Sequence, residues 1–396
     1  MYPRAIMKYA SIATRLADLG SAKWAVHIDG KRRAAKGEKM IFLSIGEPDL
    51  APPVAILDEA NRAMRAGRLR YSPGKGEANM VAALSRYYTR QTGREIGADQ
   101  FLFLAGTQMA LATAFITILE PGDEVLLLDP YYATYEAVVT APGGVPVAVP
   151  LDPDRGFHPD IAAIEKAVTS KTKAILLNSP SNPTGAVFTR AENIAIGDIA
   201  KRHDLWIISD EVYATQVHGN HVFHSPFFEK DLEERTIVVS SISKSHALPG
   251  FRCGWIAASA DYCNHVLPVT ESLMFGSQPF LQDATAFALD NHFDETDAMK
   301  NAYLARARVL MDGVKNAKGV SVHLPEGGMF LMLDVRKTGL SGEAFARRLL
   351  EEENVVTMPG ESFGAKGAGH VRVALTVDEA TMAEAARRIV HLAGRI

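Results

Sequence analysis

Polar side chains that could carry out chemistry stand directly after apolar runs in the middle of the chain. Asp210 follows residues 205–209, and Lys244 follows residues 236–240. Lys244 stands shortly before Ala-Leu-Pro-Gly, which is an unusual place for a surface charge. In a partly apolar site the pKa of a lysine falls, and its amine can form a Schiff base. An aspartate beside a ring nitrogen would keep that nitrogen protonated, which makes the ring an electron sink.

A helix start and an arginine complete this chemistry. Thr107 and Gln108 follow the apolar run 101–104 and open a predicted helix, whose free backbone N–H groups suit a phosphate. Arg252 follows Lys244 within the same segment. Because ligands bind at the carboxyl ends of parallel strands, we expect these groups to converge on one edge of a sheet. A phosphate, a ring and an electrophilic carbon are the parts of pyridoxal 5′-phosphate, so the residues predict this cofactor.

Each feature has a commonplace alternative when it stands alone. Asn182-Pro-Thr-Gly is a good turn sequence. Asp210 and Glu211 after an apolar strand could simply cap a helix. Gly106-Thr107 is also an ordinary helix start. The combination of these features favours a cofactor site.

The apolar pattern predicts an α/β protein. Continuous apolar runs such as 174–177 indicate strands that are buried on both faces, which is typical of a mostly parallel sheet between helices. The strands are predicted at 101–104, 125–128, 145–149, 173–177, 205–209, 236–240 and 254–258, and helices at 54–66, 77–92, 107–119, 160–169 and 189–203.

The pattern changes after about residue 290, which indicates a second domain. We expect a large cofactor-binding domain of residues 46–289 and a smaller α+β domain of residues 1–45 and 290–396. The smaller domain is predicted to contain helices at 294–317, 341–352 and 378–393 and strands at 320–324, 329–333 and 371–375.

The composition is that of a globular protein and excludes some classes of partner. The chain has 396 residues with 47% hydrophobic residues and a net charge of −4, which does not suit a general nucleic-acid binder. Residues 101–119 carry no charge, but a Gly-Thr break favours a strand and a helix over a membrane span. No secretory signal is evident, and there are two cysteines, so the expected location is the cytoplasm.

The segment from Ser241 to Gly254 resembles the lysine signature of the class I, fold-type I aminotransferases, with Cys253 in place of an aliphatic residue. The resemblance covers nearly the whole chain. It implies the PLP-dependent transferase fold type I and a homodimer with active sites at the subunit interface. Other matching motifs are Ile45-Gly-Glu-Pro48, Asn182-Pro-Thr-Gly185, Asp210-Glu-Val-Tyr213, Pro359-Gly-Glu-Ser-Phe-Gly364 and His370-Val-Arg372-Val.

The resemblance implies a role for each matching residue. Lys244 would form the Schiff base and move the substrate proton, and Asp210 would hold the pyridinium nitrogen. Tyr213 and Asn182 would hydrogen-bond the ring oxygen O3′, and Tyr132 would stack on the ring. The implied phosphate contacts are Thr107, Gln108, Ser241, Arg252 and, from a second subunit, Tyr71; the implied substrate contacts are Arg372 at the α-carboxylate, Asn182, and the backbone of Gly46.

The implied reaction moves an amino group from an L-amino acid to a 2-oxo acid such as pyruvate or 2-oxoglutarate. In the dicarboxylate-specific branch a basic residue after the lysine motif holds the distal carboxylate, but no Lys or Arg occurs between Arg252 and Lys300. Another branch has a lysine where Gln108 stands here. Glu271 and Asp283 could suit a cationic substrate, or they could be surface or helix acids.

A closer resemblance to arginine–pyruvate transaminases covers residues 243–247, 275–283 and 327–341 and favours a basic or neutral donor. The alternatives are an aspartate or aromatic aminotransferase, or a PLP-dependent β-lyase on the same fold. A lyase would share Lys244 and Asp210, and it would form a 2-oxo acid without an acceptor.

Other classes of function have weaker support. Gly74-Lys-Gly76 follows no strand and lacks a third glycine, so a dinucleotide-binding dehydrogenase is disfavoured. A non-enzymatic domain on this fold would lack the lysine or arginine of the motif. His218, His221 and His224 lie three apart in a predicted loop, where we expect solvated side chains and no metal site.

Overall fold

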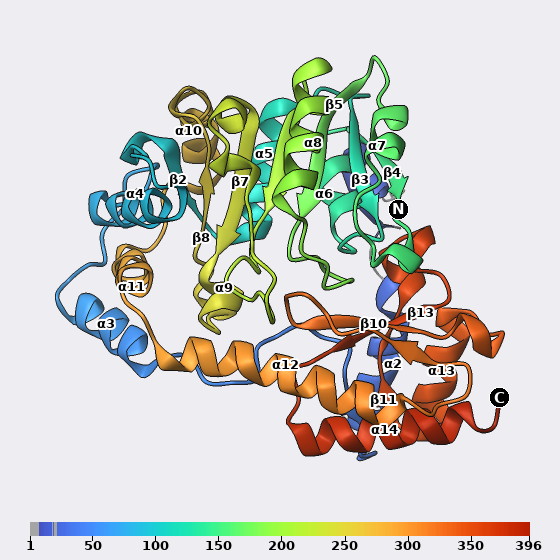
Figure 1. Ribbon diagram of the computed structural model, residues 1–396. Helices are drawn as coiled ribbons and strands as arrows, with labels where there is room; N and C mark the ends of the chain where they lie inside the picture. The colour runs from blue at the N-terminus through green and yellow to red at the C-terminus, as the bar shows by residue number, and fades with distance from the viewer. Residues whose placement is uncertain (1–7, 18, 20–21) are drawn as a thin grey trace, which may run out of the picture.

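A seven-stranded sheet forms the centre of the protein (Figure 1). The structure is a computed structural model that describes residues 8–17, 19 and 22–396. The strand order is β2-β8-β7-β6-β5-β3-β4, and β8 runs antiparallel to both of its neighbours while β7 to β4 run parallel. This confirms the predicted mostly parallel sheet. The strands are β2 (Phe101–Leu104), β3 (Glu124–Asp129), β4 (Val145–Pro150), β5 (Thr172–Asn178), β6 (Trp206–Asp210), β7 (Thr236–Ser241) and β8 (Gly254–Ala257).

Both faces of this sheet are buried, which explains the uninterrupted apolar runs. Successive side chains of a strand point to opposite faces, so Ile175 and Leu176 of β5 belong to two different hydrophobic clusters. The cluster of Leu176 includes Phe115 of α5 (Thr107–Ile118), and that of Ile175 includes Ile196 of α8 (Arg190–Arg202). Helices therefore cover the sheet on both sides, as predicted.

The second half of the fold is built on a smaller antiparallel sheet of order β12-β13-β10-β9. Val26 and Leu43 lie in one hydrophobic cluster with residues of its helices, so the N-terminal segment packs beside the C-terminal part (Figure 1). The domain boundaries at residues 45 and 290 stay a prediction. The elements are β9 (Ser321–Val322), β10 (Phe330–Asp334), β12 (Met358–Pro359), β13 (His370–Ala374), α12 (Asp294–Val314), α13 (Gly342–Glu353), α14 (Glu379–Ala393), and the separate pair β1 (Ile41–Phe42) and β11 (Val355–Val356).

The remaining helices include two of twelve or more residues that the pattern did not predict. These are α10 (Ala260–Met274), which contains Pro268 in its interior, and α11 (Pro279–Asp290). Within the described part of the chain, no helix has the length and apolarity to cross a membrane, and the uncharged run 101–119 forms β2 and α5. The other helices are α1 (Ser11–Ala17), α2 (Ala25–Ala34), α3 (Val54–Arg65), α4 (Ala78–Thr92), α6 (Tyr135–Thr140), α7 (Ile161–Ala167) and α9 (Ile242–Ser245).

The parallel strands place three polar residues along one edge of the large sheet. Asn178, Asp210 and Ser241 are the last residues of β5, β6 and β7. The register pairs Asn178 with Asp210, so these two side chains stand side by side at that edge.

Candidate active site

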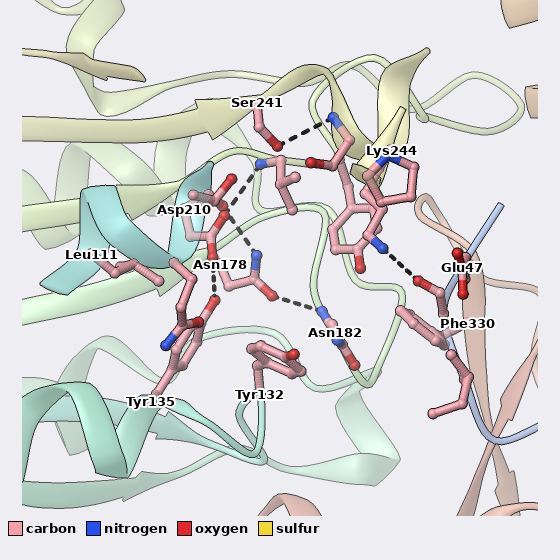
Figure 2. Close-up of a pocket in the computed structure, with 18 of the residues that line it drawn as sticks. Glu47, Leu111, Tyr132, Tyr135, Asn178, Asn182, Asp210, Ser241, Lys244 and Phe330 are labelled. Carbon is pink, nitrogen blue, oxygen red and sulfur yellow. Dashed lines mark hydrogen bonds between the residues drawn. The ribbon is translucent and has the colours of Figure 1, made fainter. Parts of the chain in front are cut away.

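A cavity of about 390 Å³ lies at this edge, and its walls come from both sheets (Figure 2). It collects all of the site residues that the sequence predicted except Tyr71. The predicted residues that line it are Gly46, Thr107, Gln108, Tyr132, Asn182, Asp210, Tyr213, Ser241, Lys244, Arg252 and Arg372.

Lys244 lies on α9, directly after the end of β7. Its Nζ donates a hydrogen bond to the carbonyl oxygen of Gly46 at 2.5 Å (Figure 2). Its own carbonyl accepts one from Nε2 of Gln216 at 2.8 Å, which fixes the backbone from the opposite side. Burial lowers the pKa of Lys244 to about 8, so the neutral amine is far more populated near neutral pH than in an ordinary lysine.

Asp210 is held by three neighbours at the end of β6. The hydroxyl of Tyr135 donates to its Oδ2 at 2.8 Å, and the backbone N–H of Val212 donates to its Oδ1 at 3.2 Å. The side chain of Asn178 donates to its backbone carbonyl at 3.0 Å. Burial raises the pKa of Asp210 to about 6. A cationic group in the cavity would stabilise this carboxylate as an anion.

The ends of β5 and β6 also position the groups that could face a ring. Oδ1 of Asn178 accepts from the backbone N–H of Asn182 at 2.7 Å, which fixes the turn after β5. Tyr132 packs edge-on against Tyr135 with ring centroids 5.6 Å apart. Tyr213 is buried, and this burial raises the pKa of its hydroxyl, which therefore remains a hydrogen-bond donor.

A candidate anion site lies where α5 begins. Gly106 has φ 85°, a backbone conformation that favours glycine, and a guanidinium nitrogen of Arg252 would lie within 2.4 Å of a Cβ atom built there. Ser241 caps α9 nearby. The hydroxyl oxygen of Thr107 is buried and has no hydrogen-bond partner among the described residues. A helix N-terminus beside an arginine and hydroxyl groups is suited to a phosphate.

Arg372 lies on β13 with 1% of its surface exposed. Its Nη1 donates to Oδ1 of Asn182 at 2.9 Å, and its Nη2 donates to the carbonyl of Ser44 at 2.5 Å. The rings of Phe330 and Phe363 lie 4.2 and 4.5 Å from its guanidinium carbon. Burial lowers its pKa to about 10, and its Nε has no partner among the described residues. A free, buried N–H of an arginine is suited to a carboxylate.

Several functional contacts were missed in the sequence. Tyr135 lies three residues after Tyr132, and a turn in which its N–H donates to the carbonyl of Tyr132 at 3.0 Å brings both rings to the cavity. Trp24 and Glu47 also line the cavity. Glu47 could have been predicted from the sequence, because it stands next to Gly46 in the Ile-Gly-Glu-Pro motif. Trp24 belongs to no recognised motif, so its position could not be predicted from the sequence.

Tyr71 lies outside the cavity. Its side chain is 86% exposed and contacts the ring of Phe275, with centroids 5.3 Å apart. Its predicted contact with the phosphate of a second subunit stays a prediction. Of the two acids considered for a cationic substrate, Asp283 accepts from Nε of Arg68 at 2.8 Å and is engaged within the chain, while Glu271 is exposed.

The expectation of solvated histidines is wrong for His218. This side chain is buried, and its Nε2 lies 2.8 Å from the carbonyl of Gly328. The cause is a β-bridge between Val217 and Gly327, which brings the loop against the start of β10. Among residues 8–17, 19 and 22–396, no three His, Cys, Asp or Glu side chains gather as metal ligands would.

Comparisons with known proteins agree with this geometry. Residues 38–389 match the family described as aminotransferase class I and II. The chain is 37% identical to arginine–pyruvate transaminase of Pseudomonas aeruginosa over 98% of this chain and 99% of that protein. It is 32% identical to a probable aspartate/prephenate aminotransferase of Aquifex aeolicus over 96% of this chain and 97% of that protein. A solved structure of a Thermus thermophilus aspartate aminotransferase double mutant superposes with a TM-score of 0.91 at 29% identity, covering 98% of this chain and all of that one.

The fold is that of the fold-type I, pyridoxal-phosphate-dependent transferases, with a large sheet domain and a smaller α+β part. The chain belongs to the class I and II aminotransferase family, and it is an amino-acid aminotransferase. The resemblance stated from the sequence motifs is thereby confirmed.

Proposed function

We propose that the chain binds pyridoxal 5′-phosphate in this cavity through Lys244 and transfers an amino group from a basic or neutral L-amino acid to a 2-oxo acid. When bound, this cofactor supplies an aldehyde carbon that links to amines and a protonated ring that accepts electrons. The observation that carries the proposal is the convergence of an amine, a carboxylate and an anion site on one cavity. The unpartnered Oγ1 of Thr107 and Nε of Arg372 fit a bound phosphate and a bound carboxylate.

The cofactor-binding roles follow from the positions of the polar groups. Asp210 would keep the proton on the ring nitrogen, and Tyr135 and Asn178 hold this carboxylate in place. Tyr213 and Asn182 would donate hydrogen bonds to the ring oxygen. Tyr132 would stack on the ring face, and the phosphate would be bound by Thr107, Gln108, Ser241 and Arg252.

Lys244 would also move the substrate proton. A base works best when its pKa lies near the working pH, and burial lowers the pKa of Lys244 to about 8. Arg372 would bind the α-carboxylate of both substrates, because its planar guanidinium retains a free N–H. The carbonyl of Gly46 lies beside the lysine amine and closes this side of the cavity.

The identity of the donor is supported by the charges of the cavity wall. The described lining residues include three cations, Lys244, Arg252 and Arg372, and each has a role above, so none remains for a distal carboxylate. Glu47 at the exposed mouth offers a carboxylate to a basic side chain. The relative named arginine–pyruvate transaminase supports the same preference.

A donor screen tests the substrate class. Each amino acid is added to the cofactor-loaded enzyme without an acceptor, and bleaching of the visible absorbance is followed. We expect fast bleaching with arginine or a neutral amino acid. Fast reaction with aspartate and none with arginine would contradict the proposal. Gln108→Lys adds a cation to the wall and should raise the rate with aspartate relative to arginine.

The attachment site is tested with Lys244→Ala. We expect loss of turnover and of the absorbance of the lysine-bound cofactor, because no other amine occupies that position. Lys201→Ala, which removes a surface lysine paired with Asp231, should behave like the wild type. An active, yellow Lys244→Ala enzyme would refute the assignment.

The proposed assembly is a homodimer located in the cytoplasm. Tyr71, Phe275 and Leu69 are 86%, 68% and 63% exposed, and such a group of large apolar side chains supports a subunit contact. Both cysteines are free and buried, which suits a reducing compartment. Sedimentation of the wild type and of Tyr71→Ala with Phe275→Ala tests the dimer, and a wild type that sediments as a monomer would contradict it.

A further inference from the structure

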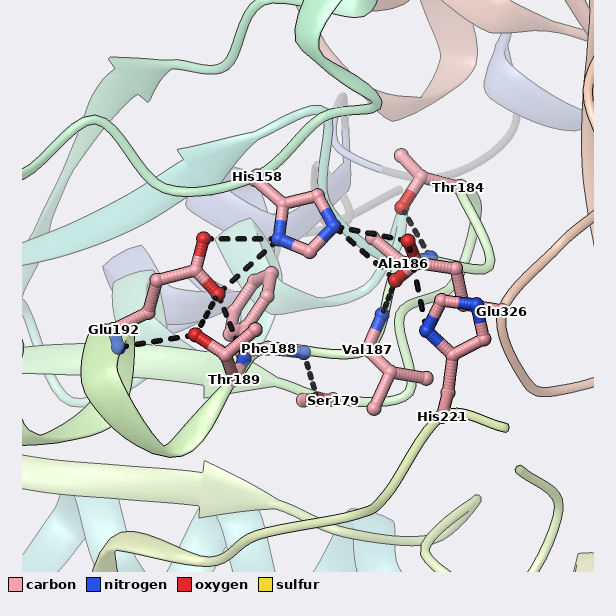
Figure 3. A network of polar contacts seen from close by, with 10 residues as sticks. All are labelled: His158, Ser179, Thr184, Ala186, Val187, Phe188, Thr189, Glu192, His221 and Glu326. Atoms are coloured by element: carbon pink, nitrogen blue, oxygen red, sulfur yellow. Dashed lines mark hydrogen bonds and ion pairs between the residues drawn. The ribbon is translucent and has the colours of Figure 1, made fainter. Parts of the chain in front are cut away.

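A histidine lies between two carboxylates outside the cavity (Figure 3). Nδ1 of His158 lies 2.9 Å from Oε1 of Glu192, and its Nε2 lies 3.1 Å from Oε2 of Glu326. His158 precedes α7, Glu192 is in the first turn of α8, and Glu326 precedes β10. The ring therefore joins two elements of the large sheet region to the smaller sheet.

The geometry favours a doubly protonated ring. A neutral imidazole has one N–H and one lone pair, and that lone pair would face a carboxylate. Two N–H donors satisfy both acids. The titratable groups that face the ring are Glu192 and Glu326, and His221 lies behind Glu326 with its Nδ1 3.8 Å from Oε1. Hydrogen bonds to both acids raise the pKa of His158 to about 10.

Glu326 is also attached to the turn that carries Asn182. Its Oε2 accepts from the backbone N–H of Val187 at 2.8 Å, and its own N–H donates to the carbonyl of Gly185 at 3.0 Å. The same carbonyl accepts from the N–H of Gly327 at 2.9 Å. The turn after β5 and the segment before β10 are therefore fixed to each other at Glu326.

Both of these segments contact Arg372. Asn182 accepts from its Nη1 at 2.9 Å, and Phe330, four residues after Glu326, lies 4.2 Å from its guanidinium carbon. A displacement of Glu326 would change both contacts of the guanidinium. His158 does not line the cavity, and its hydrogen bond to Glu326 is its polar link to the segment before β10.

We propose that His158 is a positioning residue for substrate binding: as a cationic bridge between Glu192 and Glu326 it holds the segment from Glu326 to Phe330 and the Asn182 turn around Arg372. The proposal rests on the role of Arg372 proposed above. The bridge sets the affinity for the carboxylate of donor and acceptor alike. The covalent attachment of the cofactor at Lys244 does not depend on the bridge.

Steady-state kinetics of the holoenzyme test the proposal. His158→Gln keeps one hydrogen bond and loses the charge, so we expect KM for donor and for acceptor to rise roughly five- to tenfold with kcat within about twofold. Glu326→Gln should raise both KM values, whereas Glu192→Gln, on the side away from the cavity, should raise them less. His203→Gln is the matched control, because His203 pairs with Glu165 at 2.6 Å at the other end of α8. Unchanged KM values in His158→Gln would overturn the proposal.

The protonation state gives a second, independent readout. In the wild-type holoenzyme labelled with 15N-histidine, with His158→Gln used for assignment, both ring nitrogens of His158 should show protonated shifts at pH 8. One unprotonated nitrogen, or a titration midpoint near pH 6.5, would overturn the bridge. The spectrum does not depend on substrate binding. Unchanged KM values in Arg372→Lys would contradict the proposed role of Arg372 in binding carboxylates. The spectrum would still show whether His158 is a cationic bridge.

Discussion

The pKa values of buried groups are shifted in opposite senses in the cavity around Lys244 and in the cluster around His158. In the cavity, burial lowers the pKa of Lys244 to about 8 and that of Arg372 to about 10, and it raises the pKa of Asp210 to about 6. All three shifts disfavour the charged form. In the cluster, hydrogen bonds to two acids raise the pKa of His158 to about 10, which favours the charged form.

The two regions also differ in whether their buried polar groups have hydrogen-bond partners, and this difference indicates which of them binds a ligand. Oγ1 of Thr107 and Nε of Arg372 have no partner among the described residues, whereas both ring nitrogens of His158 have one. Thr107 and Arg372 both line the cavity, and a buried polar group without a partner costs about 1–3 kcal/mol, so a ligand in the cavity that bonded to them would recover that cost. The cluster already contains its own counterions and needs no ligand.

The largest expected effect comes from removing the buried charge at the sheet edge. Asp210→Asn keeps the shape of the side chain but cannot hold a proton on a ring nitrogen, so we expect kcat to fall on the order of 10²–10⁴-fold. Rapid kinetics of the loaded enzyme measure this. Asp231→Asn, at the surface, serves as the control. If kcat of Asp210→Asn stayed within tenfold of the wild type, the cavity would lose its assigned chemistry.

A smaller effect is expected at the carboxylate site. Arg372→Lys keeps the positive charge but loses the planar guanidinium, which can donate two parallel hydrogen bonds to a carboxylate. A hydrogen bond to a charged group contributes about 1.5–3 kcal/mol. We therefore expect kcat/KM to fall roughly 10- to 150-fold for donor and acceptor. Arg347→Lys, a partly exposed arginine paired with Glu343, should leave kcat/KM unchanged. An unaffected Arg372→Lys enzyme would remove this residue from the site.

Tyr135→Phe should lower the activity less than the two substitutions above. The Tyr135 hydroxyl lowers the pKa of Asp210 by donating to its Oδ2, so its removal raises that pKa further. The ionised carboxylate would then be lost at higher pH, and the acid limb of the pH–rate profile should move upward. A neutral hydrogen bond of about 0.5–1.5 kcal/mol predicts a roughly two- to tenfold loss of activity. An acid limb that does not move would argue against this contact.

A further expected effect concerns stability instead of activity and applies to the cluster. The pKa of His158 is raised above the ordinary value of 6.5, so its contribution is fully present below pH 6.5 and is lost as pH rises through about 10. We expect His158→Gln to lower the free energy of unfolding by about 1–2 kcal/mol at pH 6 and by less above pH 10. Urea unfolding at both pH values measures this. If the loss of unfolding free energy in His158→Gln were larger at high pH than at pH 6, the result would contradict a cationic His158.

The motifs predicted most of the site because strand ends of a parallel sheet meet at one edge. Asp210 ends a strand, Asn182 and Lys244 stand shortly after the ends of two others, and the structure brings all three to one cavity. The hydrogen bond of Tyr135 to Asp210 joins residues 75 positions apart and leaves no trace in the local pattern. The burial of His218 likewise depends on a long-range bridge.

The fold was predictable to a similar extent. The seven strands of the large sheet were found because each is a short apolar run bounded by turn residues. Helix α10 was missed because Pro268 interrupts its sequence pattern. Strands β1, β11 and β12 were missed because each has only two residues and therefore no periodicity to detect.

The central claim is that the Nζ atom of Lys244 holds pyridoxal 5′-phosphate. Borohydride reduction of the yellow holoenzyme, followed by digestion and mass spectrometry, makes the carbon–nitrogen link permanent and locates it. The account predicts one modified peptide that contains residues 243–245, with the phosphopyridoxyl mass on Lys244. A phosphopyridoxyl group on another lysine, or none in an enzyme that is active and yellow, would contradict it.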